Sequence, residues 1–195
     1  GTQKQFGVLD ENPPLLSAVP NQKILVFQLG GGVLYFVDIV TKTQVQRIKV
    51  SSDKSWILQA LFTSDGKRGF ALSENGYLSY FNVETGDVTK SFWPHQLLGR
   101  YKIGIGKIIL DESKDLLYGI SMSYMHFYVS VFDLEKGELQ KVTKRALPVP
   151  MERDPNAGQE ILDASLSPDG NTLAIAGEDC QILLLDIDTL KTKGV

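Results

Sequence analysis

Short apolar runs alternate with clusters of turn-forming residues along the whole chain, which is the pattern of a protein built from β-strands. Four of the runs are rich in β-branched and aromatic residues, and each ends at an Asp or Asn that precedes a turn. These runs occupy residues 33–38, 77–82, 128–133 and 182–186. Helical periodicity is nearly absent, since residues 96–106 and 151–161 contain glycine or proline and keep no apolar stripe. The sequence therefore predicts an all-β fold.

The Asp or Asn at the end of each run follows another turn-forming residue at a nearly constant distance. The pairs are Asn21 with Asp38, Asp65 with Asn82 and Asp169 with Asp186, each 17 residues apart, and Asp115 with Asp133, 18 residues apart. The four end residues are themselves separated by 44, 51 and 53 residues. Periods of about 40–50 residues that contain several short strands are typical of β-propeller blades. We therefore expect four four-stranded antiparallel blades, at residues 15–50, 57–93, 106–145 and 161–195.

The second repeat shows the blade most clearly, with strands at 57–62, 68–73, 77–82 and 88–93. The Asn75-Gly76 pair between its second and third strands favours a tight turn with positive φ. We expect positive φ or another restricted backbone conformation at Gly66, Gly76 and Gly170, because glycine alone adopts it without steric cost.

Residues 166–186 resemble a blade of the WD-repeat family. Asp179 and Asp186 match the two Asp positions of that family, and Leu185 takes the place of its Trp. By the same resemblance, Asn75 and His126 stand where the turn Asp would be in the second and third repeats. No repeat has the Gly-His pair or a true Trp-Asp. Residues 82–86 are also similar to the Asp-x-x-Thr-Gly turns of YVTN-type and amine-dehydrogenase-like propellers.

The resemblance implies a ring of seven or eight blades, of which this chain would supply four. Both outer blades would then keep an exposed apolar flank, which proteins rarely leave bare. Completion by further chain, by self-association or by a partner all remain open. Residues 1–14 are expected to form an N-terminal arm or a closing strand for another blade.

Composition excludes several functional classes. The formal net charge is −3, whereas a nucleic-acid platform normally carries a basic surplus. No stretch approaches the roughly 20 apolar residues of a membrane span. Cys180 is the only cysteine, so no internal disulfide exists, which suits the cytoplasm. An exported protein whose signal peptide has been removed is the alternative.

The residue types needed for catalysis or metal binding do not cluster. His95 and His126 are the only histidines, too few for a structural zinc site. Cys180 follows Glu178 and Asp179, which disfavour a thiolate. Three further groups have simple structural interpretations: residues 30–32 and 104–107 are glycine-rich but precede strands instead of helices, Glu152, Asp154 and Glu160 lack the ligand spacing of a calcium site, and Lys141, Lys144 and Arg145 protect an edge strand. We expect no enzyme activity, no cofactor and no metal.

The long connections are those that join one blade to the next, at residues 51–56, 93–105 and 146–160, and the turn at 122–126 is also enlarged. In propellers these segments share one face, and insertions confined to one face mark the binding face. Aromatic residues and arginine are typical interface anchors. The candidate site residues are Trp56, Trp93, His95, Arg100, Tyr101, Tyr124, His126 and Arg153.

Two functional hypotheses follow. The first is a scaffold that holds a protein or peptide on this long-loop face. The second is an exported propeller that binds or acts on a small molecule, as lactonase-like and amine-dehydrogenase-like relatives do. The second requires a carboxylate or histidine cluster at the centre of the ring or a cofactor-bearing partner subunit, and the sequence shows neither. We therefore expect the first.

Overall fold

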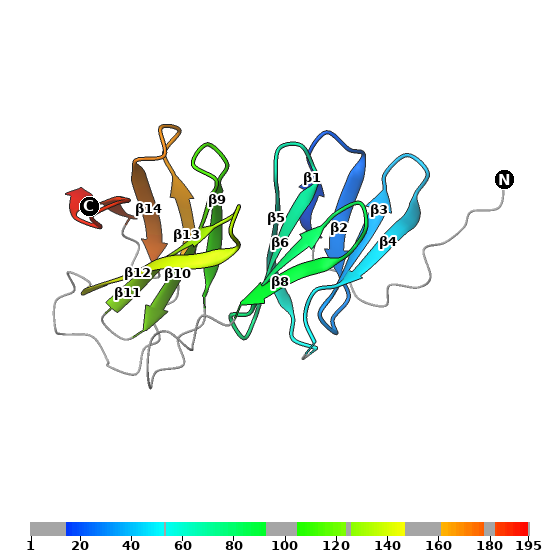
Figure 1. The fold of residues 1–195 in the computed structure, drawn as a ribbon, viewed down its shortest axis with the longest axis horizontal. Helices are drawn as coiled ribbons and strands as arrows, with labels where there is room; N and C mark the ends of the chain where they lie inside the picture. The colour runs from blue at the N-terminus through cyan, green and yellow to red at the C-terminus, as the bar shows by residue number, and fades with distance from the viewer. Residues whose placement is uncertain are drawn as a thin grey trace. The chain divides into compact units, whose positions relative to one another are not determined.

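The computed structural model describes residues 15–52, 54–92, 105–123, 126–146, 161–177 and 182–194. Within these ranges every regular element is a β-strand and there is no helix. The chain divides into two compact units, residues 1–93 and 94–195, and each unit holds two four-stranded antiparallel sheets (Figure 1). The predicted all-β fold with four four-stranded antiparallel sheets is confirmed.

In the first unit, each sheet is made of consecutive strands, so that every strand pairs with its neighbours in sequence. The first sheet contains β1 (Leu15–Val19), β2 (Ile24–Gln28), β3 (Val33–Asp38) and β4 (Thr43–Lys49), and the second contains β5 (Ile57–Phe62), β6 (Arg68–Ser73), β7 (Leu78–Asn82) and β8 (Val88–Phe92).

The second unit repeats this topology. The third sheet contains β9 (Lys107–Asp111), β10 (Leu116–Ser123), β11 (His126–Asp133) and β12 (Glu138–Ala146), and the fourth contains β13 (Ile161–Leu166), β14 (Thr172–Gly177), β15 (Ile182–Asp186) and β16 (Thr192–Gly194).

The prediction of an enlarged turn at residues 122–126 is wrong. β10 continues to Ser123 and β11 begins at His126, and these two residues pair directly in the antiparallel register. The additional residues therefore lengthen the strands, to eight residues each against six in β6 and five in β7. Aromatic residues such as Phe127 and Tyr128 favour a strand at this position.

The regular spacing of turn residues has a structural cause at the end of the third strand of each sheet. There the side-chain oxygen of the terminal Asp or Asn accepts hydrogen bonds from backbone amides two or three residues later, which closes the turn. The Oδ1 atoms of Asp38 and Asn82 each accept two such bonds, at 2.7–2.9 Å. Asp133 and Asp186 each accept one from the amide three residues further on.

The two sheets of each unit pack face to face in the same way. Within each unit, the earlier sheet packs on the later one. We call the face of the earlier sheet that makes this contact its leading face. The trailing face is the opposite face of a sheet. In the second and fourth sheets, it is the face that packs on the preceding sheet. Strand register assigns both faces in every sheet, because side chains alternate along a strand.

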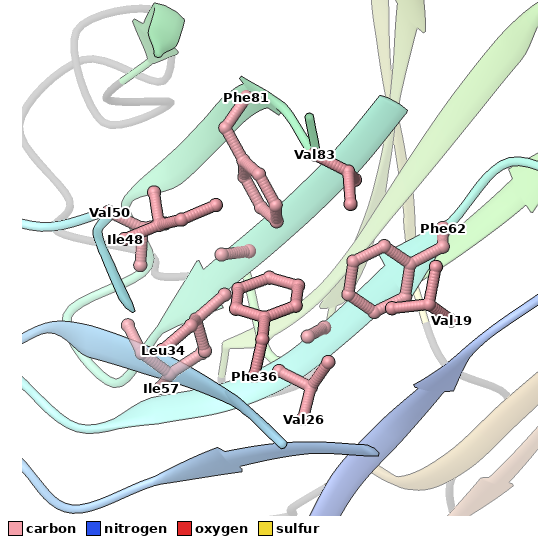
Figure 2. Close-up of a cluster of buried hydrophobic side chains, with 12 residues drawn as sticks. Val19, Val26, Leu34, Phe36, Ile48, Val50, Ile57, Phe62, Phe81 and Val83 are labelled. Atoms are coloured by element: carbon pink, nitrogen blue, oxygen red, sulfur yellow. The ribbon is translucent and has the colours of Figure 1, made fainter. Parts of the chain in front are cut away.

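In the first unit, Val26, Leu34 and Phe36 on the leading face of the first sheet pack against the second sheet (Figure 2). The rings of Phe36, Phe62 and Phe81 contact one another edge to face, with centroids 6.0–6.4 Å apart. This geometry places the positive ring edge on the negative ring face, which adds about 0.5–1.5 kcal/mol per pair to the burial of the rings.

In the second unit, Tyr118, Ile120 and Val129 on the leading face of the third sheet belong to one core with the trailing face of the fourth. The fourth sheet contributes the aliphatic side chains of Leu173, Ile175, Leu183 and Leu185 to this core.

A polar contact between first turns accompanies this packing in both units. The Gln22 side-chain amide donates to the Gly66 carbonyl oxygen (3.4 Å), and Lys114 Nζ donates to the Gly170 carbonyl oxygen (2.7 Å). A side chain on either glycine would come within 3.0 Å of the preceding sheet. The predicted positive φ is confirmed at Gly66, Gly76 and Gly170, at 69°, 79° and 66°.

Candidate partner-binding site

The connection between the two sheets of the first unit, residues 50–56, is held at both ends by backbone hydrogen bonds. The amides of Val50 and Ser51 both donate to the Gly32 carbonyl oxygen. Gly32 has a φ of 69°, and a Cβ there would lie 2.6 Å from the Ser51 carbonyl oxygen, so that only glycine fits. At the other end, the Glu74 amide donates to the carbonyl oxygen of Trp56.

These bonds bring three segments to one end of the unit: the turn 29–32, the connection 50–56 and the turn 74–77. We call this end the long-connection face. Buried Gln28 accepts a hydrogen bond from the Ile57 amide through its side-chain oxygen. Leu29 and Trp56 are the chain neighbours of this bonded pair, and they are 44% and 48% exposed. Two large apolar side chains are therefore displayed on a backbone that is fixed from several sides.

A hollow of about 320 Å³ lies at the same end of the unit. Its lining residues come from the end of β4, the connection, the second turn and β8; they are Lys49, Val50, Ser51, Ser52, Tyr77, Val88 and Ser91. The lining combines an aromatic ring, aliphatic groups, hydroxyls and one lysine. Such a surface suits an extended segment that offers both apolar side chains and backbone polar groups.

Of the eight candidate residues from the sequence, the structure describes the side chain of Trp56 alone. His126 is the first residue of β11, opposite Ser123 on β10 and Ala146 on β12. The other six, Trp93, His95, Arg100, Tyr101, Tyr124 and Arg153, lie outside the described residues. So do Cys180, Asp179, Glu152, Asp154 and Glu160.

Sequence reasoning missed Leu29 and Tyr77. Leu29 directly precedes the Gly30–Gly32 turn, which does join two strands as predicted. A leucine directly before three consecutive glycines was the available signal for Leu29. The lysines predicted on an edge strand, Lys141 and Lys144, do lie on β12 at the edge of the third sheet.

Turn closure accounts for the lowered pKa values of four acidic residues, Asp38, Asp65, Asp169 and Asp186. The hydroxyl and the amide of Thr189 lower the pKa of Asp186 to about 2. Hydroxyls of the residues two positions earlier lower the pKa of Asp65 and Asp169, and backbone amides lower that of Asp38. Hydrogen bonds to the charged form explain every one of these shifts. Each of these carboxylates has a turn-closing role and gives no sign of proton transfer.

No group of three or more His, Cys, Asp or Glu side chains that could hold a metal ion occurs among the described residues. The described part of the chain also holds no helix long and apolar enough to cross a membrane.

Comparison with known proteins adds no family to this description. No protein-family model matches the chain, and a search of curated proteins finds no significant relative.

Proposed function

We propose that the chain is a segment of a WD-repeat-like β-propeller and that it binds a protein or peptide through its long-connection face. The propeller assignment is supported by the topology of the four sheets, each an antiparallel run of consecutive strands. It is further supported by the way the sheets pack, because the faces that meet in the first unit and in the second occupy the same positions relative to the turn-closing Asp or Asn. Asn75 supports the WD-like character, since its Oδ1 accepts bonds from the Ser73 hydroxyl and the Tyr77 amide and so closes the turn.

The observation that carries the binding proposal is the exposure of Leu29 and Trp56 on the long-connection face, the end of the unit at which the hollow also lies. The backbone of Trp56 is held by the Glu74 amide, so that binding has to order mainly its side chain and more of its burial contributes to affinity. Tryptophan is also the residue type most enriched among interface residues whose truncation costs 2 kcal/mol or more. The opposite end of the unit has turns whose carboxylates are engaged by backbone amides.

The proposal extends to the other candidate residues from the sequence. His126 at the start of β11 and, outside the described ranges, Trp93, His95, Arg100, Tyr101, Tyr124 and Arg153 would enlarge the same face in a complete propeller. The combined change Trp93→Ala and Tyr101→Ala should then weaken binding without loss of folding, because side chains of connections contribute little to sheet cores.

The test uses peptides selected on the wild-type chain from a random displayed library, and it compares two variants with similar exposure. Trp56→Ala should reduce the affinity of the selected peptides about 30-fold, which corresponds to 2 kcal/mol. Val40→Ala is the matched control: Val40 is 63% exposed in the β3–β4 turn at the opposite end, and its change should leave affinity intact. Peptides that lose affinity with Val40→Ala and keep it with Trp56→Ala would contradict the proposed face.

A further inference from the structure

A second hollow of the first unit lies at the end opposite the long-connection face, and the proposed function does not use it. Its volume is about 350 Å³, and we call it the turn-end hollow. Its polar side chains are those of Gln22, Gln46, Asp65, Lys67 and Glu84. Gly66, Ile24 and Val83 complete the lining.

Two glutamine side chains of the first sheet bond to backbone carbonyls of the second sheet at this hollow. Gln22 Nε2 donates to the Gly66 carbonyl oxygen at 3.4 Å, and Gln46 Nε2 donates to the Glu84 carbonyl oxygen at 3.5 Å. Both distances exceed the usual range of about 2.7–3.2 Å for such bonds. Since a carbonyl oxygen has two lone pairs, both carbonyls keep the capacity for a second, shorter bond.

The second unit makes both bonds at equivalent positions, with lysine in place of glutamine. Counted from the residues that pair with the third strand near its turn-closing Asp, Lys114 takes the place of the first glutamine and Lys141 that of the second. Lys114 Nζ donates to the Gly170 carbonyl oxygen at 2.7 Å, and Lys141 Nζ donates to the Asp188 carbonyl oxygen at 3.2 Å. Lys114 Nζ also lies 3.8 Å from Asp111 Oδ2. An ammonium group therefore bonds more closely than an amide at both positions, as charge-assisted bonds do.

The acidic residues at the hollow recur in the second unit, whereas the two ammonium groups do not recur in the first. Asp65 and Glu84 stand at the same distances from Asn82 as Asp169 and Asp188 do from the turn-closing Asp of the fourth sheet. The cation in the lining of the turn-end hollow is Lys67. Two carboxylates and one ammonium group leave this lining with one net negative charge.

The hollow also offers enough acceptors for one more cation. Asp65 Oδ1 is engaged by a hydroxyl and an amide of its own turn, but the carboxylate has a second oxygen, and Glu84 is exposed. Each glutamine that donates through its NH₂ group keeps its side-chain oxygen as an acceptor. An ammonium group needs only three acceptors. Ile24 and Val83 supply apolar surface of the kind on which the stem of a lysine packs.

We propose that the turn-end hollow binds a primary alkylammonium group from outside the chain, in the place that lysine ammonium groups of the chain itself take in the second unit. The ammonium group donates to the Gly66 or Glu84 carbonyl oxygen and to the acidic side chains, and the alkyl chain lies on the apolar lining. A lysine side chain of a partner and a free aliphatic diamine share this chemistry. The inference is independent of the partner proposed for the long-connection face, because the two sites lie at opposite ends of the unit.

The test follows the backbone amide signals of the chain by NMR during titration at constant ionic strength. The probes are cadaverine and a lysine blocked at both backbone ends, and the neutral control is pentanediol. At least one amine should shift the signals of Gly66 and Glu84 saturably, with a Kd in the millimolar range because few atoms are buried. Saturation by the blocked lysine alone would indicate a protein-borne lysine, and saturation by cadaverine alone a free amine. Saturation by neither amine, or equally by the diol, would overturn the proposal.

Gln46→Lys is the decisive variant, because it gives the first unit an ammonium group that the second unit already has. It should keep the circular dichroism spectrum and lower the affinity for the amine about tenfold or more, by competition for the Glu84 carbonyl oxygen. Gln44→Lys is the matched control: it makes the same change on the same strand, at an exposed position outside the lining, and should leave affinity intact. Equal affinities of these two variants would contradict the proposed site.

Lys67→Gln tests the charge of the lining in the opposite direction. Lys67 is exposed, so the change should not disturb folding, and removal of the cation should raise the affinity for the amine. An unchanged or lower affinity would contradict the electrostatic part of the proposal, even if Gln46→Lys failed to fold.

Discussion

Gly69 on β6 offers the sharpest test of the packing between the sheets of the first unit. It lies directly opposite Phe81 on β7, and the Cβ of an alanine would fall 2.2 Å from two carbons of the Phe81 ring. That is 1.2 Å short of the 3.4 Å at which ordinary contact begins. The ring cannot simply move away, because Phe36 and Phe62 contact it edge to face.

The expected cost of Gly69→Ala follows from two opposing terms. Overpacking of a filled core costs about 1–3 kcal/mol. The φ of Gly69 is not positive, so alanine adds no backbone strain and returns about 0.4–1 kcal/mol by restricting the unfolded chain. We expect a net loss of about 1–2 kcal/mol in the free energy of unfolding. Combination with Phe81→Leu should be less damaging than the sum of the single changes, with a coupling of about 1 kcal/mol or more.

Urea unfolding followed by tryptophan fluorescence and circular dichroism measures these values. Both tryptophans lie in residues 1–93, so that fluorescence reports the first unit. Gly106→Ala in the second unit is the control for a glycine-to-alanine change in a strand environment, and circular dichroism follows it because fluorescence does not report that unit; the nearest neighbour of its Cβ would be 3.8 Å away, and its φ is also not positive. It should leave stability unchanged or slightly raised. A Gly69→Ala variant as stable as the control, with no coupling to Phe81→Leu, would refute the described packing of Phe81.

Two other changes test the turns. Gly76→Val should destabilise by about 1 kcal/mol or more in urea unfolding, because valine adopts a φ of 79° only with strain, and Gly76→Asn should cost less; equal stability of Gly76→Val and wild type would argue against this turn. The pKa of Asp186 is lowered in the folded state from its ordinary 3.8 to about 2, so its charged form stabilises the fold above pH 3.8, and this contribution is lost as the pH falls to about 2. Asp186→Asn should therefore flatten the dependence of Tm on pH between those values, and an unchanged slope would contradict the assigned hydrogen bonds.

Strand content and turn positions could be predicted from the sequence because they depend on local chemistry. The 17-residue spacing identified Asp38, Asn82 and Asp186, whose side chains close turns through bonds to nearby amides. The third sheet shows the limit of this reasoning. Residues 122–126 contain no glycine or proline, but two aligned strands can lengthen without leaving a signal that separates them from an enlarged turn.

Contacts between sheets could not be predicted, since they depend on which side chains meet across a long sequence separation. Nothing local marks Gln22 as the donor to Gly66 or Lys114 as the donor to Gly170. Only part of the candidate site could be predicted from the sequence, because it too is assembled from segments that are distant in the chain. Trp56 was found as an exposed aromatic residue in a long connection, whereas Leu29 is placed beside it by the bond between Gln28 and Ile57.

The pairing of consecutive strands in every sheet also bears on how the chain folds during synthesis. Each ladder can be completed from local chain, as the fourth sheet is between residues 161 and 194, so that no strand waits for a distant partner. Low sequence separation of contacts favours rapid formation, and N-terminal segments leave the ribosome first. In each unit the earlier sheet would then present its leading face as a template, and the next sheet would dock on it as soon as its own ladder closed. In each unit, the direction of translation would thus be the direction of assembly.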